Sequence, residues 1–432
     1  MNLALSEEQT MIRDSAAEVL AERSASAAVR QAIEHRAGRD DDLWHTLAGE
    51  LGWCALIVPE AVGGAGLGAM ELVLLMEQMG RRLACVPYFS TVCLAAMALA
   101  QCESAAARGW LSRIASGEVS ATLALQAGAD FDGRTASAYA VTGSHTPAVS
   151  VYAEETADGY RLSGTLAQVF DGASADLLLV PALIANEAQT IALFELNCAD
   201  LGGLTRTALV TLDMTRPLAH IELNAVDVPR NALLAYGREA QRALSVTAWF
   251  ATLALAAEQL GGAQQCLDLT LAYTTERVQF GRAIASFQAI KHRCAQMMVE
   301  IEATRSAVLG AAQAWDQART LVPDPMRYQA GGSLPPDVLA DIATAKATAN
   351  DAFRFCAQEA IQLHGGVGFT WEYDPQLYFK RAQACSAQFG TTAQMLSFIA
   401  EQVIDRGEAL SAVRPLPLNH ADHAQAVLAG VL

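Results

Sequence analysis

Residues 277–288 read RVQFGRAIASFQ and join two long stretches of helical periodicity. The first stretch covers residues 246–275 without a proline, and the second covers residues 288–320. A third stretch runs over residues 338–363 and stops at the glycine pair 365–366, where a helix is expected to end. Two of these helices exceed about 25 residues without the charged heptads of a coiled coil, so the sequence predicts a helical bundle here.

The sequence texture changes upstream of this bundle. Between residues 120 and 235 the apolar runs become short, and Asp158-Gly159 forms a hairpin signal between two runs suited to strands. The first third of the chain has helical periodicity instead, and Ser6 with Gln9 forms a capping box at its start. The sequence therefore predicts an α+β protein with a helical domain at 1–119, a β domain at 120–237, a helical bundle at 238–410 and a tail at 411–432.

Composition excludes several classes of function. The 432-residue chain has 46 acidic and 29 basic residues, a net charge of -17, and no run of Lys or Arg, so no nucleic-acid partner is expected. No apolar run approaches the roughly 20 residues of a membrane span, and the N-terminus lacks the basic region of a signal peptide. The nine cysteines are scattered and never spaced as Cys-x-x-Cys, which predicts reduced thiols in a cytoplasmic protein.

Two further motifs accompany the segment at 277–288. Residues 362–369 read QLHGGVGF, and residues 52–67 read GWCALIVPEAVGGAGL. In order and spacing the three motifs resemble those of the acyl-CoA dehydrogenase family, over about residues 3–405. The resemblance implies an N-terminal helical domain, a middle β-barrel or sandwich and a C-terminal four-helix bundle. It also implies α,β-desaturation of an acyl-CoA thioester with FAD as the cofactor.

The same motifs suit the dinucleotide half of FAD. A pyrophosphate needs cationic and backbone N–H donors, and Arg277 offers a planar guanidinium. Gly365 and Gly366 let the backbone approach a ligand without a Cβ. In the family such residues grip the FAD of a neighbouring subunit, so a dimer at least, and usually a tetramer, is implied. The resemblance assigns to FAD the residues Arg277, Gln279, Phe280, Ile284, Gln288, Gln362, Gly365, Gly366 and Thr391.

Each motif also has a purely structural interpretation. Arg277 could be a charge that complements a helix C-terminus, and the glycine pair could be only a helix stop. The combined pattern favours the cofactor interpretation over both. His364 is interpreted as structural, because no second His, Cys or carboxylate lies near it at metal-ligand spacing, and no metal site is expected. A loose dinucleotide fingerprint at residues 64–69 is rejected, because no βαβ unit surrounds it.

The chain departs from the family at the catalytic base. The usual base is a Glu just before Gly-Thr, and that position is Phe389 here, which cannot accept a proton. A second base position used in the family falls at or near Ala251. Glu258 is the only nearby carboxylate, about 10 Å further along the helix, and is the tentative catalytic residue. The favoured alternative is a buried Glu258 that is paired with an Arg or a backbone group.

Two segments of the β region depart as well. Residues 125–130 read LQAGAD, and residues 168–170 read QVF in place of the Trp-Ile-Thr segment that walls the flavin in the family. Residues 370–372 (TWE) and 213–216 (DMTR) resemble a bacterial subgroup that forms α2β2 heterotetramers. In that subgroup one subunit supplies the base and the flavin wall, and the other supplies the ADP-binding edge. This chain is similar to the second kind.

The resemblance implies three partners: an acyl-CoA substrate, a second acyl-CoA dehydrogenase chain and an electron-transfer flavoprotein as acceptor. Subunit pairs of this kind act on bulky acyl-CoA esters, including sterol side chains and aromatic or cyclic acids. A backbone N–H at residue 389 would still polarise a thioester carbonyl, whatever the side chain. Two alternatives stay open: a non-catalytic assembly or ADP-binding subunit, and a different flavoenzyme such as an acyl-CoA oxidase.

Overall fold

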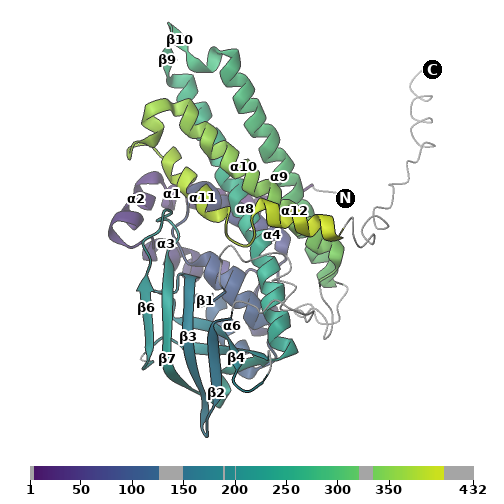
Figure 1. The fold of residues 1–432 in the computed structure, drawn as a ribbon. Coiled ribbons are helices and arrows are strands. Elements are labelled where there is room, and N and C mark those ends of the chain that lie inside the picture. Colours follow the sequence, from purple (N-terminus) through teal and green to yellow (C-terminus); the bar gives the residue numbers. More distant parts are fainter. Residues whose placement is uncertain (1–3, 126–148, 188–189, 200, 321–333, 403–432) are drawn as a thin grey trace, which may run out of the picture.

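The computed structural model describes residues 4–125, 149–187, 190–199, 201–320 and 334–402. Figure 1 shows a helical bundle above, with a sheet and a second group of helices below it. The predicted order of a helical, a β and a second helical part is confirmed, and the domain limits stay predictions. Most of the segment at residues 125–130 and the whole of the tail at 411–432 lie outside the described residues.

The N-terminal part is helical, as predicted. Ser6 caps the first helix: its hydroxyl accepts from the Gln9 N–H at 3.1 Å, and the Gln9 side chain accepts from the Ser6 N–H at 3.0 Å. The second helix was not predicted, because its N-cap, Ala25, makes no side-chain hydrogen bond that would mark its start. The helices are α1 (Glu7–Arg23), α2 (Ser26–His35), α3 (Asp41–His45), η1 (Thr46–Glu50), η2 (Trp53–Ala55), η3 (Glu60–Val62), α4 (Ala69–Arg82), η4 (Phe89–Ala96), α5 (Met97–Ala100) and α6 (Ala105–Ala115).

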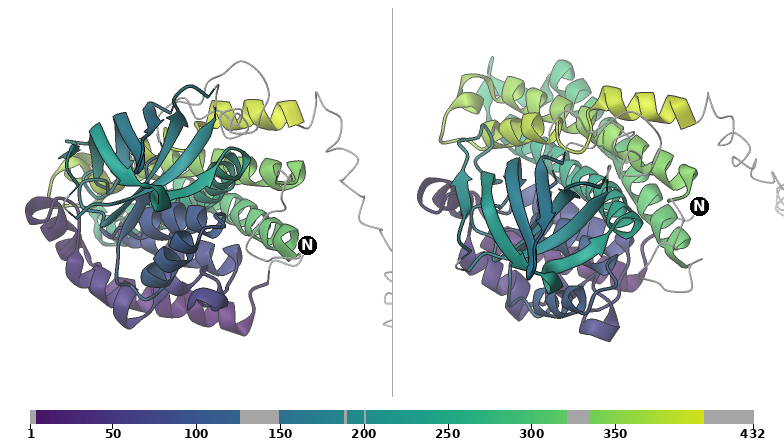
Figure 2. Two further views of the ribbon diagram at one scale, coloured as in Figure 1. Left: turned by 90° about the horizontal axis from the view of Figure 1, so that it is seen from below. Right: turned by 60° about the horizontal axis from the view of Figure 1, so that its bottom comes forward.

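The middle part forms one eight-stranded sheet, which refines the predicted barrel or sandwich. Its order is β6-β7-β3-β2-β4-β5-β8, with β1 also paired to β4. The hairpin at Asp158-Gly159 joins β2 to β3 antiparallel, as predicted, whereas β1 and β2 both run parallel to β4. The N-terminal helices lie against one face of the sheet (Figure 2). The strands are β1 (Ala121–Leu123), β2 (Val151–Glu155), β3 (Gly159–Phe170), β4 (Leu177–Ile184), β5 (Ile191–Asn197), β6 (Leu204–Ala208), β7 (Leu218–Pro229) and β8 (Leu233–Tyr236).

The C-terminal helices match the predicted ranges to within a few residues, apart from an earlier start of the first. That helix begins at residue 238 and is 39 residues long. By length and composition it is apolar enough to cross a membrane, but 94% of its most apolar window is buried inside the fold. The elements are α8 (Arg238–Glu276), β9 (Val278–Gln279), β10 (Arg282–Ala283), η6 (Ile284–Ser286), α9 (Gln288–Thr320), α10 (Pro336–His364), η7 (Gly365–Phe369), α11 (Pro375–Cys385) and α12 (Thr392–Ala400).

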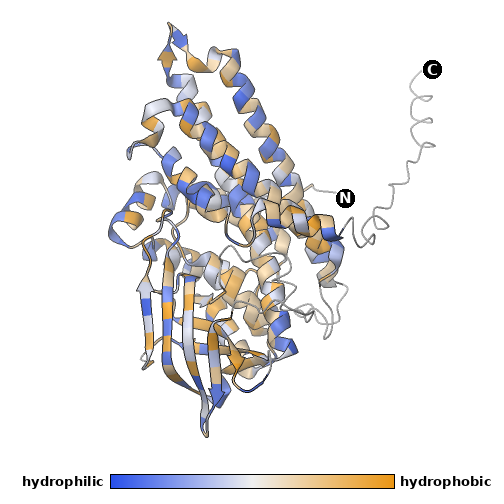
Figure 3. Ribbon diagram, in the orientation of Figure 1, coloured by the Kyte–Doolittle hydropathy of each residue, from blue (hydrophilic) through white to orange (hydrophobic). Residues whose placement is uncertain are grey.

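Two glycines let α8 cross α4 at very short range. A Cβ built on Gly261 would lie 1.8 Å from the Glu77 carbonyl oxygen, and one on Gly80 would lie 1.9 Å from the Glu258 carbonyl oxygen. The backbone of the other helix therefore packs directly against each glycine, and no larger residue fits there unless a helix moves. This crossing ties the bundle to the N-terminal helices. Figure 3 shows apolar residues gathered along α8 and the helices behind the sheet, while the outer strands alternate in hydropathy.

The segment after the glycine pair is held by α2. Trp371 donates its indole N–H to the Glu34 carboxylate at 2.9 Å, and Arg30 donates to Asp374 Oδ1 at 2.6 Å. The Arg30 guanidinium also lies over the Trp371 ring, 5.2 Å from its centroid. These contacts fix the turn that follows Gly366, so the unpredicted helix α2 helps to position a predicted site residue.

Candidate active site

The ends of α8 and α10 meet at one end of the bundle. The Tyr273 ring stacks on the His364 ring with centroids 4.3 Å apart and an interplanar angle of 20°. His364 is buried, its Nδ1 lies 2.6 Å from the Ala360 carbonyl oxygen, and burial lowers its pKa. This arrangement fits the structural role predicted for His364. It brings Arg277, just after α8, to the same end as Gly365, just after α10.

Arg277 opens a short hairpin that stands out from this end (Figure 1). The Arg277 N–H bonds the Tyr273 carbonyl at 2.9 Å, and its own carbonyl accepts from the Ile284 N–H at 2.9 Å. Phe280 and Gly281 form a two-residue turn with φ of +55° and +78°. A bulky residue rarely adopts positive φ, and the Phe280 side chain is 92% exposed. Arg277, Gln279 and Phe280 thus face outward, where a ligand or a second chain can reach them.

The other predicted FAD residues border the same end. Ile284 lies in η6 and Gln288 begins α9, while Gln362 is exposed in the last turn of α10. Gly365 has φ of +67°, which explains why a glycine ends the helix. A Cβ added to Gly366 would meet nothing within 4 Å, so no packing inside this chain requires that glycine. The open backbone at Gly366 fits the close approach of a dinucleotide.

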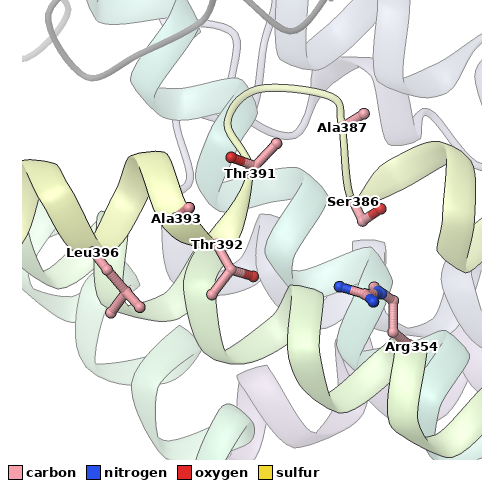
Figure 4. Close-up of a pocket in the computed structure, with 7 residues that line it drawn as sticks. All are labelled: Arg354, Ser386, Ala387, Thr391, Thr392, Ala393 and Leu396. Atoms are coloured by element: carbon pink, nitrogen blue, oxygen red, sulfur yellow. The ribbon is translucent and has the colours of Figure 1, made fainter.

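Thr391 lies elsewhere. It caps α12, and its side chain accepts from the Gln394 N–H. It borders a cavity of about 420 Å³. Arg354 of α10 lines the same cavity, together with Ser386 and Thr392 (Figure 4). Eight residues, or about 12 Å of helix, separate Arg354 from Gln362. The structure therefore does not join Thr391 to the other predicted FAD residues within one chain. The cavity is lined by Arg354, Ser386, Ala387, Thr391, Thr392, Ala393 and Leu396.

Arg354, Ser386 and Thr392 line this cavity and were not among the residues expected to bind a ligand. Arg354 is one exposed charge on a long helix, and Ser386 follows the end of α11, so neither belongs to a motif. The cavity combines a cation, hydroxyl groups and the N-terminal end of α12, which together favour an anionic ligand. The one relevant signal in the sequence is that Asn350 and Arg354 are four residues apart, which places both on one face of α10.

Phe389, the residue expected at the family's base position, is buried in an aromatic cluster formed by Phe89, Phe170 and Phe389. The Phe389 ring stacks on Phe170 with centroids 6.0 Å apart and an interplanar angle of 13°. Phe89 meets both rings edge-on, at 5.8 Å and 5.4 Å. Phe389 thus touches the segment 168–170, which is expected to stand where the family has its flavin wall.

Glu258 is buried in an ion-pair network. Its Oε1 accepts from Arg381, and its Oε2 accepts from Arg216. Arg381 also donates to Asp213 Oδ2 at 2.6 Å; burial alone would lower the pKa of Arg381, but Asp213 and Glu258 outweigh burial and raise it. The Arg216 guanidinium lies 4.9 Å from the Phe89 centroid, so it packs against the aromatic cluster. This arrangement agrees with the alternative interpretation of Glu258 as a buried carboxylate that is paired with an Arg.

A further buried carboxyl adjoins the aromatic cluster. Asp171 follows Phe170, has φ of +52°, and accepts from the Ser90 hydroxyl at 2.6 Å. Burial raises the pKa of Asp171, while Ser90 and Arg216 act in the opposite direction. Asp171 was not predicted to have a role, because one Asp before a glycine is an ordinary turn signal. In the part of the chain that the structure describes, no cluster of His, Cys, Asp or Glu could hold a metal ion.

Comparisons with known proteins agree with this geometry. Residues 6–118 match the N-terminal domain of acyl-CoA dehydrogenases, and residues 249–404 match the C-terminal domain. The acyl-CoA dehydrogenase IpdE2 of Mycolicibacterium smegmatis is 30% identical over 402 residues, 92% of this chain and 100% of the relative. The crystal structure of the ChsE4-ChsE5 complex from Mycobacterium tuberculosis contains a chain with a TM-score of 0.75 and 28% identity, over 96% of this chain and 100% of that chain.

A variant of the steroid ACAD Tcur3481-Tcur3483 has a TM-score of 0.75 and 29% identity, and the similarity covers 93% of this chain and 99% of that chain. The matches thus span the helical, β and bundle parts together. The chain therefore belongs to the acyl-CoA dehydrogenase family, whose members are flavoprotein oxidoreductases that act on CH–CH bonds.

Proposed function

We propose that this chain is a subunit of a hetero-oligomeric acyl-CoA dehydrogenase that holds the ADP half of an FAD, while a partner chain supplies the catalytic base and the flavin wall. The observation that carries the proposal is the direct stacking of Phe389 on Phe170. α,β-Desaturation needs the acyl chain between a base and a hydride acceptor. A single intervening layer would require about 7 Å between the flanking rings, at two contact distances of about 3.5 Å. The 6.0 Å between these centroids leaves no such layer.

The two candidate base positions support the same assignment. Glu258 is engaged by Arg216 and Arg381 through both of its oxygens, so it is already used as a counter-ion. Phe389 has no group that accepts a proton. Neither position offers a free base, and we assign the base that removes the α-proton to the partner chain.

The ADP half of FAD fits the hairpin end of the bundle. Arg277 would meet the pyrophosphate with its guanidinium, and Gln288 and Gln362 would hydrogen-bond the adenosine half. Phe280 would present its ring to the adenine, and the open backbone at Gly366 would admit the phosphates. Gln279 and Ile284 complete the rim, and Thr391 borders the separate cavity beside Arg354. The flavin, when bound, supplies the hydride acceptor of the reaction.

The substrate and partners follow from the family and the named relatives. The solved chains include a complex of two subunits and a protein named as a steroid ACAD, which supports a hetero-oligomer and a bulky acyl-CoA such as a sterol side-chain thioester. An electron-transfer flavoprotein is the proposed acceptor, and the cytoplasm the proposed location.

A visible absorption spectrum tests the assignment. The chain is purified alone and together with a co-expressed acyl-CoA dehydrogenase chain that has the usual Glu before Gly-Thr. We expect a colourless protein alone, and a yellow complex that bleaches when a steroid side-chain acyl-CoA is added. Flavin that is bound by the chain alone and bleached by an acyl-CoA would show a self-sufficient enzyme and refute the proposal.

A variant then tests the ADP contacts. Arg277→Gln should raise the Kd of the complex for FAD by about tenfold or more, because one charge-assisted pair contributes about 1.5–3 kcal/mol, and the flavin-to-protein ratio across an FAD titration measures the change. Lys291→Gln removes one exposed charge from the first turn of α9 and serves as the matched control. Equal flavin retention in both variants would place the ADP half elsewhere.

A further inference from the structure

Helix α2 presents one row of polar side chains to the segment that precedes α11. Ser26, Arg30 and Glu34 follow one another at intervals of four residues, so they share one face of the helix. The Ser26 hydroxyl and the Arg30 guanidinium both donate to Asp374 Oδ1 at 2.6 Å. Arg30 also donates to the Trp371 carbonyl, and the Trp371 indole N–H donates to Glu34 at 2.9 Å. Every member of the row therefore holds the same short segment.

Asp374 is committed to α2 at the expense of its own helix. It is the N-cap of α11, and Asp favours this position because its carboxylate can accept from the N–H groups of the first turn. The Asp374 side chain makes no such capping bond. It pairs with Arg30 instead, and this pair is largely buried, with 24% and 16% of the two side chains exposed. A residue that departs from its local preference in this way is expected at a functional or strained site.

Tyr373, between the two held residues, packs against the end of the bundle. Its ring meets the Tyr273 ring edge-on, with centroids 6.1 Å apart, and lies 6.3 Å from the centroid of the His364 ring. Tyr273 also accepts the Arg277 N–H on its carbonyl, and His364 directly precedes Gly365. The three rings therefore connect the segment held by α2 to both parts of the proposed ADP site.

The glycine pair depends on support of this kind. A Cβ added to Gly365 or Gly366 would meet nothing within 4 Å, so packing at the pair itself does not fix its backbone. Glycine also loses more conformational freedom on ordering than any other residue. A pair whose backbone is already ordered before a dinucleotide arrives spares the ligand this entropic cost, because preorganisation improves affinity.

We propose that Arg30 is a positioning residue for the ADP half of FAD: through Trp371 and Asp374 it orders the backbone after Gly366 before the cofactor binds. This role rests on the function proposed above, in which this end of the bundle holds the ADP half. In the described part of the chain, the hydrogen bonds of Arg30 reach Ser26, Trp371 and Asp374, none of which is assigned to FAD. Arg30 therefore acts through the held segment and not by contact with the ligand.

Titration of the assembled complex with FAD tests this role. Arg30→Ala should raise the Kd for FAD by about tenfold, as expected if about a tenth of the molecules keep the ordered segment. Arg30→Lys keeps a cation beside Asp374 but lacks the planar fork that also reaches the Trp371 carbonyl. Its Kd should fall between those of the wild type and Arg30→Ala, which is a partial rescue by the conservative variant.

Arg36→Ala is the matched control, because Arg36 is the C-cap residue of α2 and pairs with Asp40 and Asp42 instead. Its Kd for FAD should equal that of the wild type. If Arg30 served only the stability of α2, both variants would raise the Kd, and that result would overturn the inference.

Arg277→Gln separates a failure of this inference from a failure of the proposed function. A raised Kd in Arg277→Gln with an unchanged Kd in Arg30→Ala would leave the ADP site in place and refute the role of Arg30. An unchanged Kd in Arg277→Gln would refute the ADP site, and the role of Arg30 with it.

Hydrogen exchange measures the ordering of the segment without flavin. The Thr370 N–H bonds the Val367 carbonyl at 3.0 Å, and the Tyr373 N–H bonds the Thr370 carbonyl at 3.4 Å. In the flavin-free full-length chain, both amides should exchange about tenfold faster in Arg30→Ala than in the wild type, because local opening becomes easier. Arg36→Ala should leave them unchanged. Equal exchange in Arg30→Ala and the wild type would show that the bundle orders the segment without α2 and would overturn the inference.

Discussion

Glu258 shows how one residue's surroundings decide between two roles. Its carboxylate bridges Arg216, which precedes β7, and Arg381 of α11, and Arg381 continues the network to Asp213 and Thr215. Glu258 and these partners come from three separate regions of the chain: α8, residues 213–216 and α11. A buried carboxylate with two guanidinium partners is costly to disturb, because removal of one charge strands the others in a medium of low dielectric.

Glu258→Gln should therefore lower the free energy of unfolding by about 3–5 kcal/mol, the usual loss when a buried ion pair is broken. Urea denaturation measures the loss, and Glu18→Gln on the exposed face of α1 is the control. A base would behave differently: turnover of the assembled enzyme would fall by orders of magnitude while stability stayed unchanged. That second result would make Glu258 the base of this chain.

Phe389 is the other residue whose role depends on packing. Phe389→Ala removes the ring that stacks on Phe170 and leaves a cavity beneath Phe89, which should cost about 3–5 kcal/mol of stability. Phe280→Ala removes a ring that is 92% exposed and should change stability by less than about 0.5 kcal/mol. Thermal unfolding of both variants compares the two. Equal losses would mean that the aromatic cluster does not form.

At the scale of elements, the crossing of α4 and α8 gives a sharp test. Gly261→Ala places a Cβ against the Glu77 carbonyl, so the helices must separate and we expect a loss of about 2–4 kcal/mol, within the range of overpacked and strained cores. Gly109→Ala in α6 is the matched control, because its Cβ meets nothing within 4 Å. There the better helix propensity of Ala should stabilise by about 0.5–1 kcal/mol. Denaturant midpoints distinguish a loss from a gain.

Most elements could be predicted because their signals are local. The capping box at Ser6, the turn at Asp158-Gly159 and the long periodic runs each depend on residues close in sequence. α2 lacked such a signal. The parallel pairing of β1 and β2 with β4 could not be predicted either, since the paired residues lie 31 or more positions apart and alternation along a strand does not identify its neighbour.

For the whole molecule, stability should depend on pH with a maximum at about pH 8. Lys346 has an ordinary pKa of 10.5 and a pKa of about 7 when buried. Between these values the unfolded chain holds a proton that the folded chain lacks, so stability rises with pH by about 1.4 kcal/mol per unit. This contribution is lost again as the pH falls toward 7.

The trend should reverse above about pH 8. Burial raises the pKa of Cys54, Cys85 and Cys356 from 9.0 to about 12 and raises the pKa of five further cysteines, so the unfolded chain loses thiol protons that the folded chain keeps. Stability then falls as the pH rises. Urea midpoints between pH 6 and 10.5 measure both limbs. Lys346→Met should remove the rise and retain the fall, and an unchanged rise in that variant would assign it to another group.

The sequence alone determined the α+β class, the three helices of the bundle and the connecting motif at 277–288, because periodicity, caps and turns act over short separations. It also located the cofactor candidates at Arg277 and at Gly365-Gly366. Only the tertiary structure decided that Phe389 stacks on Phe170, that Glu258 is bound by two arginines, and that Lys346 reaches the loop after α11. Each of these contacts joins residues 35 or more positions apart, and burial in a shared core, rather than any local pattern, selects which of them meet.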